Sequence, residues 1–412
     1  MREDDFKKIS ALIDASDQDI IQWQSELTAI KAISPESEGE GEKEKADYLK
    51  GVLKAFSPDE MFDLNAPDDR VPAGYRPNIV TKFYGRQREK TLWILSHLDV
   101  VPPGDLSLWR SDPFKIKVEG DKIYGRGTED NQQSIVSFLV ALKALRKEQI
   151  EVELSIGFIA VSDEETGSSR GLRYLLEKGR DLFKENDLIL VPDSGNEEGT
   201  MIEVAEKSVL WLKFHTVGKQ THGSRPDLGV NSFKAASYLV TELDTLHQSF
   251  DASDSLYNYP ISTFEPTKKE SNVPNVNTIP GEDVFYLDSR ILPQYPIADV
   301  LKAIEQKVRE IQERFKVTVE VTTQNSMQAP PPTPPDAPVV QALSKAIKEV
   351  TGRDSKIMGI GGGTVAALFR EVGVHAVVWS TWDETAHQPN EYSKISSTKQ
   401  DAKIFAHIFL NG

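Results

Sequence analysis

The most informative absence in this 412-residue sequence is cysteine, of which there is none. A disulfide framework and a thiolate metal site are therefore both excluded. Long apolar runs are missing as well, and the first residues, MREDDFKKIS, lack the apolar core of a signal peptide. We therefore expect no membrane partner, and a cytoplasmic location is the simplest interpretation.

Positive charge is also in short supply. The chain has 48 basic and 64 acidic residues and a formal net charge of -16. This balance disfavours nucleic acid and anionic membranes as partners, because both are themselves anionic. The hydrophobic fraction of 39% and the charged fraction of 27% are typical of a soluble globular protein. The length predicts two domains or more, since 412 residues exceed what one compact core accommodates.

Histidines and acidic residues stand next to apolar runs along the whole chain. His97 and Asp99 follow LWIL, Asp130 precedes a predicted helix, Glu164 and Glu165 follow IGFIAVS, Asp193 follows LILV, and His387 follows AVVWS. Strand ends in an open α/β sheet are where ligands gather, and charged groups there are costly unless paired or bound to a metal. Each residue alone also fits an ordinary solvated loop position. Together, two histidines and several carboxylates suit a zinc-type site with an open position for water.

The first half of the chain alternates apolar runs with helical periodicity. Helices are predicted over residues 4–30 with a break near 14–16, and over 46–56, 131–146 and 168–178. Apolar runs lie at 78–83 and 91–95 and in the blocks EVELSIGFIAVS and DLILVP. This rhythm predicts a buried, mostly parallel sheet of the α/β class.

The pattern changes after Val204. A β segment, a helix at 231–246, two β runs around Asn275 and at 284–290, a helix at 297–314 and the run KVTVEVTT follow in that order. The order β-α-β-β-α-β is the ferredoxin-like pattern. The proline-rich segment at residues 329–338, APPPTPPDAP, suits a stiff linker or a ligand for a module that binds polyproline II segments. The final segment returns to α/β, with a helix predicted at 338–351 and a strand at 376–380.

The motifs resemble, in order and local sequence, the di-zinc metallopeptidases that include glutamate carboxypeptidase, aminoacylase, succinyl-diaminopimelate desuccinylase and bacterial dipeptidases and tripeptidases. The matching motifs are His97 with Asp99, GRGTED ending at Asp130, Glu164-Glu165 before Thr166-Gly167, Asp193, and His387. The resemblance covers nearly the whole chain. It implies a discontinuous catalytic domain at residues 1–206 and 325–412. It also implies an inserted ferredoxin-like domain at 207–324 that forms the interface of a homodimer.

Two divalent metal ions follow from this resemblance, with Zn²⁺ favoured and Co²⁺ or Mn²⁺ as alternatives. Asp130 would bridge the ions, which in such sites are roughly 3.5–4 Å apart. His97 and Asp193 would complete the coordination of one ion, and Glu165 and His387 would complete that of the other. Asp99, two residues after His97, is close enough to accept the second ring N–H of that histidine and fix its tautomer, although a plain loop acid would look the same.

Glu164 is assigned a different role from its neighbour, because adjacent residues in regular structure cannot both point at one metal. The resemblance implies that Glu164 is the general base that takes a proton from water and passes it to the leaving amine. The alternative is an acid that caps a helix before Thr166 and Gly167. The resemblance also implies a cis peptide bond between Asp130 and Asn131.

The substrate side rests on residues beyond Val204. By resemblance, His222 in GKQTHGS would reach the partner subunit's site and support the developing oxyanion, and Asn277 would lie near the same oxyanion. Arg290 would hold a substrate carboxylate through its planar fork. The alternatives are a surface histidine, a turn asparagine and a strand-end ion pair.

The glycine run at Gly361 could present backbone N–H groups of Gly362, Gly363 and Thr364 to a carboxylate, since glycine admits the turns of an anion-binding nest. A phosphate loop would look similar, but no Gly-Lys-Ser/Thr follows. The resembled family usually has an aspartate after the glycine-threonine unit, where Val365 stands here. The resemblance therefore does not extend to this detail of substrate anchoring.

The sequence favours a metal-dependent hydrolase of amide bonds in short peptides. Asp193 favours the aminopeptidase or dipeptidase type, because the family's carboxypeptidases and deacylases tend to have glutamate there. One alternative is a deacylase of N-acyl amino acids or a related amidohydrolase on the same metals. Another is a non-catalytic dimeric binding protein on a retired hydrolase scaffold, which the presence of every expected ligand and of the base disfavours.

Overall fold

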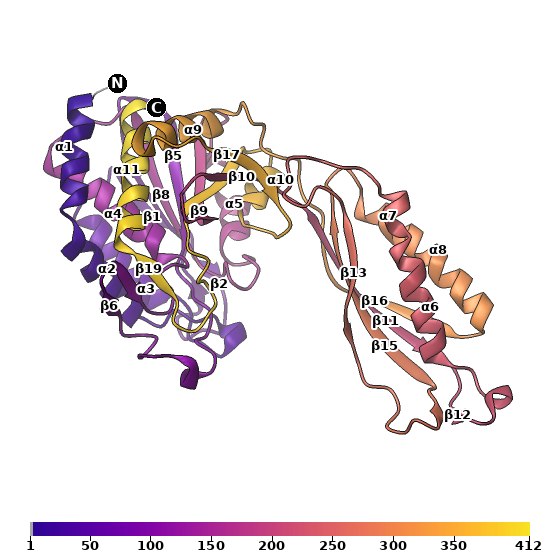
Figure 1. The fold of residues 1–412 in the computed structure, drawn as a ribbon. Coiled ribbons are helices and arrows are strands. Elements are labelled where there is room, and N and C mark those ends of the chain that lie inside the picture. The colour runs from indigo at the N-terminus through magenta and orange to yellow at the C-terminus, as the bar shows by residue number, and fades with distance from the viewer. Residues whose placement is uncertain (1–2) are drawn as a thin grey trace. The chain divides into compact units, whose positions relative to one another are not determined.

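The computed structural model describes residues 3–412 and divides into two compact units (Figure 1). Unit 1 contains the described residues up to Val204 together with Thr333–Ile357 and Thr364–Gly412. Unit 2 contains Ala205–Pro332 and Met358–Gly363. Each unit is built around its own sheet.

The sheet of unit 1 has eight strands in the order β1-β4-β8-β5-β9-β18-β10-β17. The strands β8, β5, β9 and β18 run parallel to one another, and the pairs β1–β4, β4–β8 and β10–β18 are antiparallel. The bounds are β1 Glu60–Asp63, β4 Ile79–Phe83, β5 Gln87–His97, β8 Leu154–Val161, β9 Leu188–Asn196, β10 Met201–Glu206, β17 Lys356–Ile360 and β18 Ala376–Thr381. The parallel part of this mixed sheet lies at its centre, where both faces are buried.

Helices cover both faces of this sheet (Figure 1). On one face, α4 and α11 pack together through Phe138, which contacts both Phe158 of β8 and Phe409. On the other face, α5 and α10 pack against Trp93 and the buried side chains that the central strands direct to that face. The helices of unit 1 are α1 Glu3–Asp14, α2 Asp17–Ala29, α3 Lys43–Lys54, α4 Gln132–Lys147, α5 Leu172–Gly179, α9 Pro338–Thr351, α10 Ala366–Glu371 and α11 Ile395–Asn411. The remaining strands form small ribbons: β2 Ala66–Pro67, β3 Tyr75–Arg76, β6 Lys117–Glu119, β7 Lys122–Tyr124 and β19 Tyr392–Lys394.

Two helix boundaries show how local sequence sets these elements. The predicted break near residue 15 is confirmed, because Ser16 donates its hydroxyl to the carbonyl of Ile13 and separates α1 from α2. The helix predicted at 338–351 is also confirmed. It begins with Pro338 at its first position and ends at Gly352, whose φ of 75° is the left-handed stop that glycine favours.

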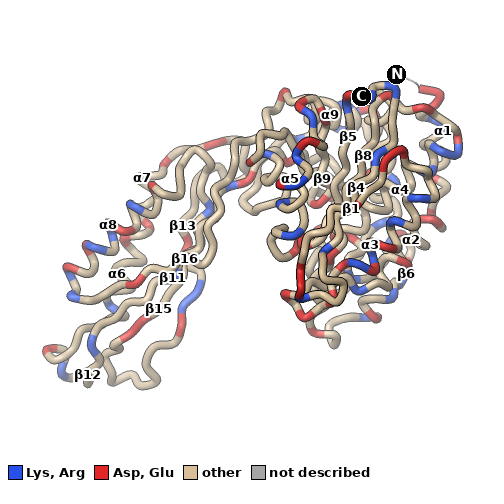
Figure 2. The backbone as a smooth tube through the Cα atoms, turned by 180° about the vertical axis from the view of Figure 1, so that it is seen from behind, with Lys and Arg blue, Asp and Glu red and all other residues tan. Residues whose placement is uncertain are grey.

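Unit 2 is a four-stranded antiparallel sheet in the order β13-β15-β11-β16, with α6 and α8 on one face (Figure 1). Its elements are β11 Ser208–Val217, β12 Thr221–His222, α6 Ser232–Asp244, α7 Leu246–Ser249, β13 Thr263–Lys269, β14 Thr278–Ile279, β15 Glu282–Ile291, α8 Ile297–Phe315 and β16 Thr318–Met327. Apolar residues of α6, α8 and the facing strands form one core. Basic and acidic residues follow one another along α8, as Figure 2 shows. The predicted α/β fold with a ferredoxin-like insertion is confirmed.

One strand of unit 2 lies away from its predicted place. The second strand of the ferredoxin-like pattern is β13, whereas Asn275 lies in a loop that leads to the short strand β14. β13 contains Pro266, and its pairing with β15 shifts between Pro266 and Lys268. Proline is tolerated at such an irregularity on an edge strand. Because proline is rare within strands, Pro266 interrupts the sequence pattern by which β13 would have been predicted. Among residues 3–412, no helix is both long and apolar enough to cross a membrane.

Candidate metal centre

Four of the five predicted ligands, and the predicted base Glu164, lie near or beyond the ends of four neighbouring parallel strands of unit 1. His97 is the last residue of β5, Glu164 and Glu165 follow β8, Asp193 lies near the end of β9, and His387 follows β18. The carboxyl ends of parallel strands meet at one edge of a sheet. The sheet order therefore collects side chains that are far apart in sequence.

Asp130, in the loop before α4, lies between the two histidines. Its Oδ1 is 2.8 Å from Nε2 of His97, and its Oδ2 is 3.2 Å from Nε2 of His387. One carboxylate thus offers an oxygen to each side of the cluster. The bond between Asp130 and Asn131 is a cis peptide, as the resemblance implied.

Each side of Asp130 has a second carboxylate. Oδ1 of Asp193 lies 3.4 Å from Nε2 of His97, and Oε2 of Glu165 lies 3.0 Å from Nε2 of His387. Donor atoms of His97, Asp130 and Glu165 lie within 4.8 Å of one another, as do those of His97, Glu164 and Asp193. Glu164 is therefore close enough to His97 and Asp193 to be either a metal ligand or a base beside the ligands.

The donor set fits two divalent cations. Oε1 of Glu165 is a buried carboxylate oxygen with no hydrogen-bond partner among the described residues, which is costly unless a cation or solvent meets it. Imidazole and carboxylate ligands without thiolate suit zinc, cobalt or manganese. His387 adopts a left-handed φ of 62°, an uncommon conformation outside glycine that clusters at functional sites.

The titration behaviour of the cluster reflects its crowding. Burial and then the nearby charge of Asp130 raise the pKa of Glu165 to about 7. Burial and the charge of Asp193 raise the pKa of Glu164 well above its ordinary value. Hydrogen bonds to Asp130 and Glu165 raise the pKa of His387 to about 10. A divalent cation would compete with protons for these groups.

Asp99 makes two kinds of contact at this centre. Nδ1 of His97 donates to the backbone carbonyl oxygen of Asp99 at 3.0 Å, whereas the carboxylate Oδ1 lies 3.5 Å away. The nearer acceptor for the ring is therefore the carbonyl and not the expected carboxylate. The carboxylate instead accepts the backbone N–H groups of Glu164 and Glu165, each at 3.1 Å.

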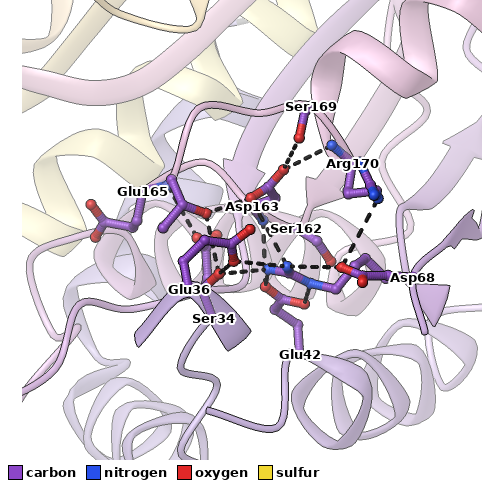
Figure 3. A network of polar contacts seen from close by, with 12 residues as sticks. Ser34, Glu36, Glu42, Asp68, Ser162, Asp163, Glu165, Ser169 and Arg170 are labelled. Atoms are coloured by element: carbon purple, nitrogen blue, oxygen red, sulfur yellow. Dashed lines mark hydrogen bonds and ion pairs between the residues drawn. The ribbon is translucent and has the colours of Figure 1, made fainter. Parts of the chain in front are cut away.

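Asp163 closes the turn that carries the two glutamates (Figure 3). Its carboxylate accepts the hydroxyl of Ser169 at 3.0 Å and the backbone N–H of Arg170 at 2.8 Å. Its own φ is 63°, in the left-handed region. In Figure 3 the carboxylate of Glu165 points away from this network. The network therefore holds the backbone of this turn, while the side chain of Glu165 faces His387.

Arg76 anchors the network behind that turn. It is fully buried, and its Nε donates to Glu42 at 2.6 Å. Its Nη1 lies within 3.9 Å of carboxylate oxygens of Glu36, Asp68 and Asp163. A buried charge is tolerated only when it is paired in this way. Motif reading missed Arg76, because its position shows no feature that separates it from a surface arginine.

The predicted substrate-side residues of unit 2 form two groups. β12 pairs with β14, and the backbone N–H of Gly223 donates to the carbonyl of Asn277 at 2.6 Å, so His222 and Asn277 lie on neighbouring strands or their ends. The exposed ring of His222 accepts the backbone N–H of Ser224 at 3.1 Å. Arg290 pairs with Asp288 at 2.7 Å and donates to the carbonyl of Gly361 at 3.0 Å.

The glycine run differs from the expected nest. An anion-binding nest needs residues that alternate between right-handed and left-handed backbone conformations. None of Gly361, Gly362 and Gly363 has the positive φ of the left-handed conformation. A Cβ at Gly363 would come within 2.7 Å of the Met327 methyl group, so a larger residue there would require the flexible end of Met327 to shift. Thr364 belongs to unit 1, and its hydroxyl lies 3.4 Å from Glu203.

Val365 packs in the core formed by α5, α10 and the central strands. It is 5% exposed. A carboxylate in these apolar surroundings would be costly unless it were paired.

Comparison with known proteins gives a consistent assignment. The model of peptidase family M20/M25/M40 matches residues 93–411. An uncharacterized metallohydrolase of Methanocaldococcus jannaschii is 42% identical over 406 residues, covering 95% of this chain and 98% of the relative. A succinyl-diaminopimelate desuccinylase of Hydrogenovibrio crunogenus is 25% identical over 394 residues, covering 95% and 98%. The aminopeptidase PepT of Bacillus cereus is alike in fold, with a TM-score of 0.74 at 18% identity and coverage of 95% and 97%.

Proposed function

Because the chain belongs to peptidase family M20/M25/M40, we propose that it hydrolyses amide bonds in short peptides as an aminopeptidase or dipeptidase. Membership makes it a metal-dependent hydrolase. The proposal adds the substrate class and the roles of individual residues.

The observation that carries the proposal is the position of Asp130. Its two carboxylate oxygens face two different histidines, at 2.8 Å and 3.2 Å. A carboxylate placed in this way suits a bridge between two ions. We assign His97 and Asp193 to one ion, and Glu165 and His387 to the other, with Zn²⁺ favoured over Co²⁺ and Mn²⁺.

Two bound cations would polarise the scissile carbonyl and lower the pKa of a nearby water molecule. Glu164 is the proposed general base. Its carboxyl group adjoins His97 and Asp193, where it can accept a proton from water and return it to the leaving amine. Asp99 holds the backbone of Glu164 and Glu165, so the base and the ligand keep their separation when the proton moves.

Substrate binding is assigned to residues of unit 2. Arg290, which donates to the carbonyl of Gly361, would hold a peptide carboxylate. The residues that follow Gly361 in sequence, Gly362 and Gly363 of unit 2 and Thr364 of unit 1, are assigned to the same role. His222 and Asn277 would support the oxyanion, with His222 serving the partner subunit of a homodimer. The homodimer and the cytoplasmic location stay predictions.

A second candidate is a deacylase of N-acyl amino acids. The relative named a succinyl-diaminopimelate desuccinylase favours it, because that enzyme's name specifies removal of an acyl group. Asp193 supports the peptidase instead, since the resembled deacylases tend to carry glutamate there. Both reactions use the same proposed metals and base.

The test is a substrate screen of protein loaded separately with Zn²⁺, Co²⁺ or Mn²⁺. Dipeptides, tripeptides, N-acetyl amino acids and N-succinyl amino acids would be compared by kcat/KM, with Glu164→Gln as the inactive control. Fastest turnover of free dipeptides or tripeptides supports the proposal. Faster turnover of an N-acyl amino acid favours the deacylase, and no metal-dependent hydrolysis of any amide contradicts both.

A further inference from the structure

Two buried carboxylates that are not assigned as ligands tie the loop of Asp130 to the loop of His387. Glu129 precedes the bridging aspartate, and Glu391 lies four residues after the histidine. Their exposures are 1% and 0%. Each makes its hydrogen bonds to the opposite loop, so the two contacts are reciprocal.

Glu129 holds the beginning of the His387 loop. Its carboxylate accepts the backbone N–H groups of Asp383 and Thr385, both at 2.6 Å, and the hydroxyl of Thr385 at 2.7 Å. The residues joined to it lie more than 250 positions away in sequence, at separations of 254 and 256. Glu129 therefore fixes the segment that leads into the histidine.

Glu391 holds the Asp130 loop from the other side. Its carboxylate accepts the backbone N–H groups of Gly127, Glu129 and Asp130 at 2.9, 3.0 and 3.1 Å. Arg126 Nη1 donates to it at 2.7 Å and balances its charge. The last of these backbone bonds is made by the bridging residue itself.

The position of His387 depends on these contacts more than on packing. Its side chain is 55% exposed, so the surrounding core does not fix it. Both ends of its loop are instead anchored to the loop of Asp130, one through Glu129 and the other through Glu391. We propose that Glu129 and Glu391 are positioning residues that set the separation of Asp130 and His387, and thereby the affinity of the ion that these two ligands share.

This inference rests on the proposed function, because it assumes that the cluster binds two ions. It also separates the two glutamates. Loss of Glu129 should release the His387 loop and weaken the ion held by His387 and Glu165. Loss of Glu391 should release Asp130 itself and weaken both ions. Such supporting contacts typically contribute 10–100-fold in metal affinity.

The experiment measures Zn²⁺ binding to metal-free protein by calorimetry, together with kcat and KM at excess Zn²⁺. Glu129→Gln should weaken one of two binding events 10–100-fold and leave the other within about threefold. Its kcat should partly recover with excess Zn²⁺ while KM stays unchanged. Glu129→Ala should have a larger effect, because glutamine keeps one accepting oxygen. Glu391→Gln should weaken both events.

Asp187→Asn is the matched control. Asp187 is a buried carboxylate that accepts the backbone N–H of Thr91 at 2.8 Å and the indole N–H of Trp93 at 2.9 Å. Both residues lie in the middle of β5, before His97 at its end. This variant should lower the melting temperature and leave both binding events unchanged. Thr385→Val tests the Glu129 contact from the other loop, should Glu129→Gln not fold.

The results distinguish failure of the positioning role from failure of the proposed two-metal function. Equal weakening of both ions in Glu129→Gln, or a lower melting temperature with unchanged Zn²⁺ binding as in Asp187→Asn, overturns the positioning role. Wild-type protein that binds fewer than two ions overturns the proposed function, and the inference with it. Selective loss of one ion in Glu129→Gln and in Thr385→Val supports the assignment.

Discussion

Asp130 and His97 meet at 2.8 Å through Oδ1 and Nε2, although one lies in the loop before α4 and the other ends β5. This contact turns the second oxygen of Asp130 toward a different histidine. The same carboxylate therefore takes part in both halves of the cluster, and its two oxygens have separate roles.

Asp130→Asn should lower the content of both metals together, because one bridging carboxylate serves two ions. Turnover should fall with metal content, as measured by elemental analysis of protein purified without chelator. Asp193→Asn is the comparison, since it should lower the occupancy of one ion only. Two tightly bound ions and a near-normal rate in Asp130→Asn would show that the residue does not bridge.

Glu164→Gln and Glu165→Gln should differ in kind. Glu164→Gln should keep its metals and lose several orders of magnitude in kcat, because a sole general base has been removed. Glu165→Gln should lose metal, because a ligand has been neutralised. Metal analysis and kcat of the two variants decide the question, and equal metal loss in both would contradict this division of roles.

Blocking the α-amino group should distinguish the two candidate reactions. An aminopeptidase or dipeptidase should stop cleaving a dipeptide once its amino group is acetylated, whereas a deacylase should prefer the acylated form. The ratio of kcat/KM for matched free and acetylated substrates measures this directly. A ratio that favours acetylated substrates would argue against the peptidase.

Activity should depend on His222 from a second subunit. A heterodimer of one His222→Ala chain and one Glu164→Gln chain should regain one competent site, in which the intact His222 serves the intact Glu164 of its partner. Each parent homodimer should be impaired, His222→Ala by about 2.7–4 kcal/mol if it removes one oxyanion donor. A verified heterodimer without recovered activity, or a fully active monomer, would rule out this arrangement.

Asp401 should make stability depend on pH. Burial raises its pKa from the ordinary 3.8 to about 7, so the folded protein keeps a proton there that the unfolded chain releases. The contribution of Asp401 to the free energy of unfolding is therefore complete below the pKa of the unfolded chain, and it is lost as pH rises through the pKa of the folded protein. With a chelator present, the unfolding free energy of the wild type minus that of Asp401→Asn should therefore fall as pH rises from about 4 to about 8. A constant difference would contradict the raised pKa.

Local sequence determined most of the elements and the types of residue proposed as ligands. Helical patterning predicted α9 and continuous apolar runs predicted the central strands, because each pattern depends on residues close together in the chain. The same reading missed β13, because Pro266 interrupts its pattern and its pairing with β15 is what defines the strand. It placed that strand near Asn275, where the chain forms a loop.

The arrangement around the ligands was decided by tertiary structure. The sequence contained His97, Asp130, Glu165, Asp193 and His387, but nothing local distinguished Glu129 and Glu391 from solvated loop acids. Their buried contacts exist because parallel pairing of β5, β8, β9 and β18 gathers the strand ends at one edge. Hydrogen bonds between loops more than 250 residues apart depend on this order of strands, which no short-range pattern specifies.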